Sequence, residues 1–357
     1  MKKKIFSALQ YMIFLGIGIF LTWWQLSKMT PLQKSQFQES LLHADYIFLV
    51  PVFIFAITGH ISRAMRWKIL IEPMGYRPSV ANTFYATMCG YFANTFLPRA
   101  GEILRCTLLS RHEKIPATKL FGTILIERIF DLFCFFLLVI FTILIQVETV
   151  SHFVKTKLLS IYNIQQGIPV WSVIVILLLL IVVFTLLAKW IFKRYEAHQF
   201  IIKIKGFQFG IKEGFLSIIH LKKRKQFIGH TLFIWGTYLA SIYIGFSALS
   251  ATSGLGIGAA FSVLSLVTVA MIVSPGGLGA FPVAVQQVLL IYNVDNISFG
   301  WMMWGTTTCI IIVAGIICFG LLIYNNRKKN EKERYHPSED FEQRRNIAPG
   351  DPVAAQK

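Results

Sequence analysis

Charged residues gather in one apolar part of the chain, between residues 80 and 131. Ionisable groups at membrane depth are energetically costly, and they tend to mark a pathway or a binding site. We therefore expect the chemistry of this chain to centre on that stretch. Six charged side chains lie in its two polar segments: Arg99, Glu102, Arg105, Glu127, Arg128 and Asp131.

The arginines of the first segment are suited to binding phosphate. Arg99 and Arg105 carry planar, permanently charged groups, and Glu102 precedes Arg105 by three residues, so these two could pair on one helical face. A helix that begins near Ala100 would direct its N-terminal amides towards the preceding turn, which is a natural anion site. The alternative is that these arginines only extend to the cytoplasmic edge of the membrane.

The second segment places two carboxylates on one helical face. Glu127 and Asp131 lie four residues apart, and Arg128 precedes Asp131 by three. An unpaired carboxylate would be costly there, so we expect these groups to face Arg99 and Arg105. Two interpretations stay open: a polar pocket for a lipid headgroup, with a proton-coupled gate as a variant, and an ion-pair cluster that only stabilises the fold.

Two further arginines close an earlier apolar run. Arg63 and Arg66 precede Trp67, and together they resemble a basic belt with an interfacial tryptophan. The alternative is that Arg63 faces inward and binds phosphate. We keep both among the candidate headgroup-binding residues, with Asn94 from the turn ahead of Arg99.

The composition is that of a polytopic membrane protein. Of 357 residues, 55% are hydrophobic and only 15% are charged. The excess of 35 Lys and Arg over 17 Asp and Glu serves topology and anionic headgroups, and no nucleic-acid-binding module is evident. The five cysteines have no metal-binding spacing, so we expect no metal, cofactor or disulfide.

Six apolar runs are long enough to cross a bilayer. The first follows three lysines and is best explained as an uncleaved signal anchor. Counting positive charges in the connecting segments places both termini in the cytoplasm. The six runs are residues 5–26, 46–66, 119–147, 171–192, 227–250 and 300–324.

Two further apolar regions, 80–112 and 257–293, are interrupted by helix-breaking residues. Crossing once would place a basic flank of the first region outside, so we expect re-entrant hairpins that enter from opposite sides. Ten full crossings are the alternative. The expected tips contain Pro98 and Gly101 in the first hairpin and Pro275, Gly276, Gly277 and Gly279 in the second.

The predicted fold is therefore an all-α polytopic membrane protein with six spans, two hairpins and an inverted-topology repeat. We expect one transmembrane domain over residues 1–325, with halves at approximately 1–147 and 171–325. A basic amphipathic segment, 193–226, would lie along the cytoplasmic leaflet, and residues 326–357 would form a disordered cytoplasmic tail.

Four motifs together resemble a known family. They are the RxxRW run at Arg63–Trp67, the segment Asn94–Arg105, the ERxxD run at Glu127–Asp131, and PGGLG at Pro275–Gly279. In this combination the chain resembles the lysylphosphatidylglycerol synthase transmembrane region, also called the flippase-like or UPF0104 family. The resemblance covers roughly residues 10–325 and implies translocation of modified phospholipids or polyprenyl-phosphate lipids. It also makes a homodimer plausible.

Two departures from the family pattern limit what the resemblance implies. No soluble aminoacyl transferase domain follows the spans, so we do not expect lysyl transfer. Phe281, Pro282 and Val283 stand where many members have a glutamate after PGGLG. The leading hypothesis is a multi-pass lipid translocase of the inner membrane that binds an anionic or aminoacylated headgroup. The alternatives are an intramembrane lipid-modifying transferase and an accessory scaffold subunit.

Overall fold

The computed structural model describes residues 16–97, 100–146 and 221–335, and within these residues it contains helices and no strand. Four helical segments are long and apolar enough to cross a membrane. They are Tyr46–Met74, Ala117–Ile145, Arg224–Phe246 and Ser298–Asn325. They agree with four of the six expected spans. The expected span 171–192 and the first half of 5–26 lie outside the described residues.

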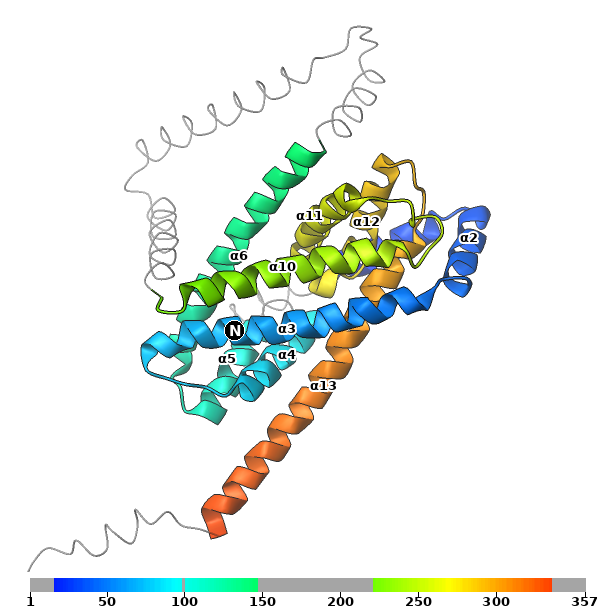
Figure 1. The fold of residues 1–357 in the computed structure, drawn as a ribbon. Helices are drawn as coiled ribbons and strands as arrows, with labels where there is room; N and C mark the ends of the chain where they lie inside the picture. The colour runs from blue at the N-terminus through cyan, green and yellow to red at the C-terminus, as the bar shows by residue number, and fades with distance from the viewer. Residues whose placement is uncertain (1–15, 98–99, 147–220, 336–357) are drawn as a thin grey trace, which may run out of the picture.

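The two central spans are α3 (Leu49–Ile71) and α10 (Arg224–Phe246). They lie side by side and run in opposite directions (Figure 1). The helices are close because Gly59 of α3 has no side chain: a Cβ there would lie 2.9 Å from Oγ1 of Thr237 on α10. This antiparallel pair is the arrangement that an inverted repeat predicts for its second span in each half.

Each expected hairpin forms two short helices. The first consists of α4 (Val80–Phe96) and α5 (Ala100–Glu113), and the second of α11 (Ile257–Val273) and α12 (Ala280–Ile291). All four helices are shorter than the roughly 20 residues that a full span needs. Their lengths favour re-entrant hairpins, and the number of crossings stays a prediction.

The tips of the two hairpins meet. The second tip contains the 3-10 turn η3 (Pro275–Gly277), where Gly276 and Gly277 have positive φ angles of 57° and 74°. Such angles favour glycine, which explains the glycine-rich sequence. A Cβ on Gly276 would lie 3.2 Å from the Cα of Thr95 at the first tip. The Gly276 carbonyl accepts a 2.9 Å hydrogen bond from the Trp304 indole.

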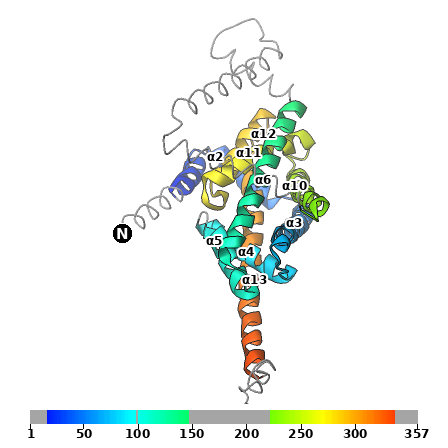
Figure 2. The same ribbon diagram turned by 90° about the vertical axis from the view of Figure 1, so that its left-hand side faces the viewer.

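The long helices α6 (Ala117–Ile145) and α13 (Ser298–Tyr335) follow the hairpins. Figure 2 shows α6 running along both hairpins, and it contacts α5 and α11. Helix α13 continues to Tyr335, so it extends beyond residue 326, where we expected a disordered tail to begin. Most of the expected amphipathic segment 193–226 lies outside the described residues.

The largest apolar core belongs to the C-terminal half. It is formed by buried residues of α10 to α13, among them Phe246, Val263, Val285, Leu289 and Phe299. A smaller core, which includes Trp67 and Leu120, packs α3, α5 and the first turns of α6 together. These helices are therefore held close enough for their polar side chains to meet.

Candidate functional site

Five charged side chains from three helices form one buried group, here called the inner cluster: Arg63 and Arg66 of α3, Arg105 of α5, and Glu127 and Asp131 of α6. Its centre is Glu127, whose side chain has no exposed surface. The carboxylate lies 3.1 Å from both α3 guanidinium groups and 3.2 Å from that of Arg105. Asp131 lies 3.1 Å from Arg63 and 2.7 Å from Arg66.

Helical spacing explains how so few helices assemble this cluster. Glu127 and Asp131 are one turn apart on α6, and Arg63 and Arg66 are three residues apart on α3, so each pair shares a face. The two faces meet, and every carboxylate therefore contacts both arginines of α3. Arg63 and Arg66 are buried and do not form the exposed basic belt that was one of our two interpretations.

Helix α10 adds hydroxyl groups to the inner cluster. Arg66 donates to Thr231 Oγ1 at 3.1 Å, and Arg63 donates to the Tyr238 hydroxyl at 3.2 Å. Sequence reasoning missed both hydroxyls, because single Thr and Tyr residues are common in apolar helices and give no signal.

An aromatic ring lies beside each arginine of the inner cluster. Arg105 is 4.8 Å from the centroid of the Trp67 ring, Arg66 is 5.7 Å from Phe227, and Arg63 is 5.8 Å from Tyr91. Each distance is within the range of a cation–π contact. The rings line the polar cluster with apolar surface and separate its charges from the surroundings.

A second ion pair, here called the pocket pair, joins Glu102 of α5 to Arg128 of α6 at 2.7 Å. We had expected that Glu102 could pair with Arg105 along one helix face. In the structure Arg105 instead pairs with Glu127, and Glu102 pairs with Arg128 of α6. The pocket pair is more open than the inner cluster, because the Arg128 side chain is 45% exposed and that of Glu102 is 22% exposed.

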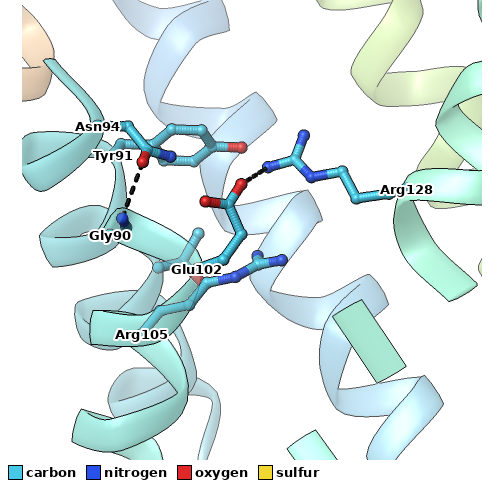
Figure 3. A pocket seen from close by; sticks show the side chains of 8 residues that line it. Gly90, Tyr91, Asn94, Glu102, Arg105 and Arg128 are labelled. Carbon is cyan, nitrogen blue, oxygen red and sulfur yellow. Dashed lines mark hydrogen bonds and ion pairs between the residues drawn. The ribbon is translucent and has the colours of Figure 1, made fainter. Parts of the chain in front are cut away.

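The pocket pair borders a small pocket between α4, α5 and α6 (Figure 3). The pocket holds about 180 Å³ of empty space, part of it open to the outside. Arg105 also lines it and is 4% exposed, so one guanidinium group connects the pocket to the inner cluster. The other lining residues are Thr87, Gly90, Tyr91, Asn94 and Gly101.

The turn of the first hairpin is fixed by Asn94. Its side-chain oxygen accepts a 2.8 Å hydrogen bond from the Gly101 backbone N–H (Figure 3). The expected interruption of the helix is present, and α5 begins at Ala100 as predicted. The Asn94 side chain therefore provides a hydrogen-bond acceptor for one backbone N–H in the first turn of α5. Its expected contact with a headgroup stays a prediction. Pro98 and Arg99 lie outside the described residues.

The second hairpin tip does not approach these charges. Its residues Pro275 to Gly279 contact Thr95, Trp304 and the helical segment 16–27. Near this hairpin the Gln25 side chain donates to Gln286 Oε1 at 2.9 Å and accepts from the Trp301 indole at 3.1 Å, and Gln286 donates to the Asp295 carboxylate at 3.4 Å. None of these polar contacts involves an arginine, in contrast to the contacts beside the first hairpin.

Among the described residues, the inner cluster and the pocket pair together contain four arginines and three carboxylates. With all of them ionised, the net charge is +1. Within the part of the chain that the structure describes, the buried Nε atoms of Arg63, Arg66 and Arg105 have no hydrogen-bond partner. The carboxylates of this group therefore do not fully balance its arginines, and two of these arginines, Arg105 and Arg128, line the pocket.

The family model of the lysylphosphatidylglycerol synthase TM region matches residues 11–300 of this chain. A UPF0104 membrane protein of Methanocaldococcus jannaschii is 29% identical over 123 residues. That match covers 34% of this chain and 37% of the relative, so it spans little more than a third of either protein. No solved structure matched the chain.

Proposed function

Because the chain belongs to the lysylphosphatidylglycerol synthase transmembrane-region family, we propose that it moves phosphate-bearing lipids between the leaflets of the bacterial or archaeal cell membrane. The headgroup phosphate would bind in the pocket beside Arg105 and Arg128. The acyl chains would stay in the surrounding lipid. This membrane would be the inner membrane in a cell that has two.

One observation carries the proposal: a net positive, partly open group of charges lies well inside the helical bundle. Arg128 is the twelfth residue of α6, about 16 Å along the helix axis from Ala117. Charges at such depth are costly and are kept mainly where they bind ions or polar substrates. Guanidinium groups are good phosphate ligands because they offer several donors in one plane.

The two layers of charge have different roles in this proposal. The inner cluster is paired on nearly every side, and its function is to hold α3, α5, α6 and α10 together. Arg105 and Arg128 border the empty space and are the headgroup ligands, and Glu102 lies beside them as the partner of Arg128. Of our two open interpretations, we assign the structural one to Glu127 and Asp131 and the binding one to Arg105 and Arg128.

The hairpins supply the movement. Their tips touch at Thr95 and Gly276, so a shift of one hairpin must displace the other. Transporters that are built from inverted repeats expose the binding site to one side of the membrane and then to the other, by rocking one repeat against the other. The charged hairpin would bind the phosphate on the cytoplasmic side. The network of Gln25, Gln286, Trp301 and the Asp295 carboxylate would release it on the outer side, because none of these four side chains offers a positive charge to hold the phosphate.

Reconstitution tests the proposal. Acyl-labelled phosphatidylglycerol is placed in both leaflets of proteoliposomes, and a membrane-impermeant reductant quenches the outer label. Wild-type protein should allow quenching to proceed beyond the outer half, and Arg105→Gln should abolish this at equal protein content. Quenching that stops at the same level as in protein-free liposomes would contradict the proposal and would favour the accessory-subunit alternative.

A further inference from the structure

The surroundings of Arg128 on α6 are apolar. Leu125 lies three residues before it and Leu132 four residues after it, so all three share one helix face. Both leucines are exposed, and so is Ile103, which follows Glu102 on α5. Exposed apolar side chains on a spanning helix face lipid. Arg128 therefore sits at a lipid-facing opening of the pocket, where an unpaired guanidinium would be costly.

The Glu102 carboxylate is held loosely in the pocket. One oxygen, Oε1, accepts from Arg128 at 2.7 Å. The other oxygen, Oε2, is buried and has no hydrogen-bond partner among the residues that the structure describes. A buried carboxylate oxygen without a partner is unfavourable, so this pairing is weaker than a fully satisfied ion pair. By contrast, both oxygens of Glu127 are paired with arginines.

We propose that Glu102 is an internal substitute for the lipid phosphate, which competes with the headgroup for Arg128. The carboxylate projects into the pocket beside Arg128 and Arg105 (Figure 3), and it presents the same chemistry as a phosphate monoanion, two acceptor oxygens with one negative charge. An incoming phosphodiester enters through the opening between α5 and α6 and replaces Glu102 as the ion-pair partner of Arg128. The inference rests on the proposed function, since it assigns a regulatory residue to that same site.

The competition has a clear role in transport. A site with net charge +1 would hold a phosphate tightly and release it slowly. Glu102 lowers that affinity and returns to Arg128 when the lipid leaves, so the arginine is never without a partner beside lipid. The ligand class is a lipid with a single phosphodiester, and the headgroup needs no amino group to be recognised.

Binding to purified protein in detergent tests the inference. The probe is a fluorescent phosphatidylglycerol, and Glu102→Gln should bind it roughly threefold to tenfold more tightly than wild type, because a partly exposed competing ion pair is removed. Arg128→Gln should bind it more weakly by a similar factor. Inorganic phosphate should compete only weakly, since it lacks acyl chains that partition into the detergent belt.

The chain offers a matched control. Glu72, in the turn after α3, and Lys223, directly before α10, form another ion pair at 2.7 Å, with side-chain exposures of 23% and 49%. Glu72→Gln removes a carboxylate of the same exposure and should leave lipid binding unchanged. Equal or weaker binding by Glu102→Gln would overturn the inference. So would weaker binding confined to an aminoacylated lipid, because Glu102 would then be a ligand for the amino group.

The two proposals can fail separately. Binding does not require leaflet exchange, so tighter binding by Glu102→Gln with no transport by wild type would contradict the proposed function alone. Transport that depends on Arg105, with unchanged binding by Glu102→Gln, would contradict the substitute role alone. Should Glu102→Gln fail to fold, Arg128→Gln decides, since wild-type affinity in that folded variant also overturns the inference.

Discussion

At the scale of the residue, Glu127 is the most constrained position of the described structure. Three guanidinium groups lie within 3.2 Å of one carboxylate that has no exposed surface. Buried ion pairs add little net stability compared with apolar packing, yet removing one partner leaves the others uncompensated. The inner cluster is therefore a place where a conservative change should have a large effect on stability.

We expect Glu127→Gln to destabilise the protein by about 3–5 kcal/mol, because Asp131 alone cannot balance three buried arginines. The thermal unfolding midpoint in detergent measures this. Glu72→Gln, which breaks an exposed pair, should lose less than about 1 kcal/mol. Equal midpoints for the two variants would show that the cluster is not essential to the fold.

The sequence predicted the members of the cluster better than their partners. The spacing of Glu127 and Asp131 correctly indicated one shared face, and the cost of burying Glu127 correctly indicated that Arg105 would be near it. Asp131 pairs instead with Arg63 and Arg66, and Arg128, which we had grouped with the two carboxylates, is half-exposed and pairs with Glu102. The pairing of Glu102 with Arg128 could not be predicted in the same way. Two arginines were available to Glu102, and the choice depends on how α5 packs against α6, which no local pattern determines.

At the scale of the element, the first hairpin depends on close contact between its two helices. Gly90 of α4 faces Gly101 of α5, and a Cβ on Gly101 would overlap the Gly90 carbonyl oxygen and the Asn94 side chain. The sequence indicated a break here from Asn94, Pro98 and Gly101. It did not indicate that Gly101 is needed for helix packing, because its partner lies on the other helix.

Gly101→Ala should therefore separate α4 from α5 and displace Arg105 from Glu127. We expect a loss of about 2–3 kcal/mol, in the range of overpacked core sites. Gly122→Ala on α6 is the control, because nothing lies within 4 Å of a Cβ there and alanine favours the helix. Thermal unfolding of both variants checks this, and a Gly101→Ala midpoint as high as that of Gly122→Ala would contradict the packing argument.

At the scale of the whole molecule, the order of spans and hairpins followed from hydropathy, helix-breaking residues and positive charge. The antiparallel α3 and α10 pair agrees with the inverted repeat that this order predicts. The contact between hairpin tips was not predictable, since Thr95 and Gly276 come from different halves of the chain. That contact joins the two halves of the chain.

The most direct measurement compares lipid movement by Arg128→Gln and Lys223→Gln in parallel proteoliposomes. Both changes remove a half-exposed cation from an ion pair, and of the two residues only Arg128 lines the pocket. We predict that Lys223→Gln moves acyl-labelled phosphatidylglycerol at the wild-type rate and that Arg128→Gln is at least tenfold slower, about 1.4 kcal/mol in the barrier. Equal rates for the two variants would contradict the claim that the pocket beside Arg128 binds the travelling headgroup.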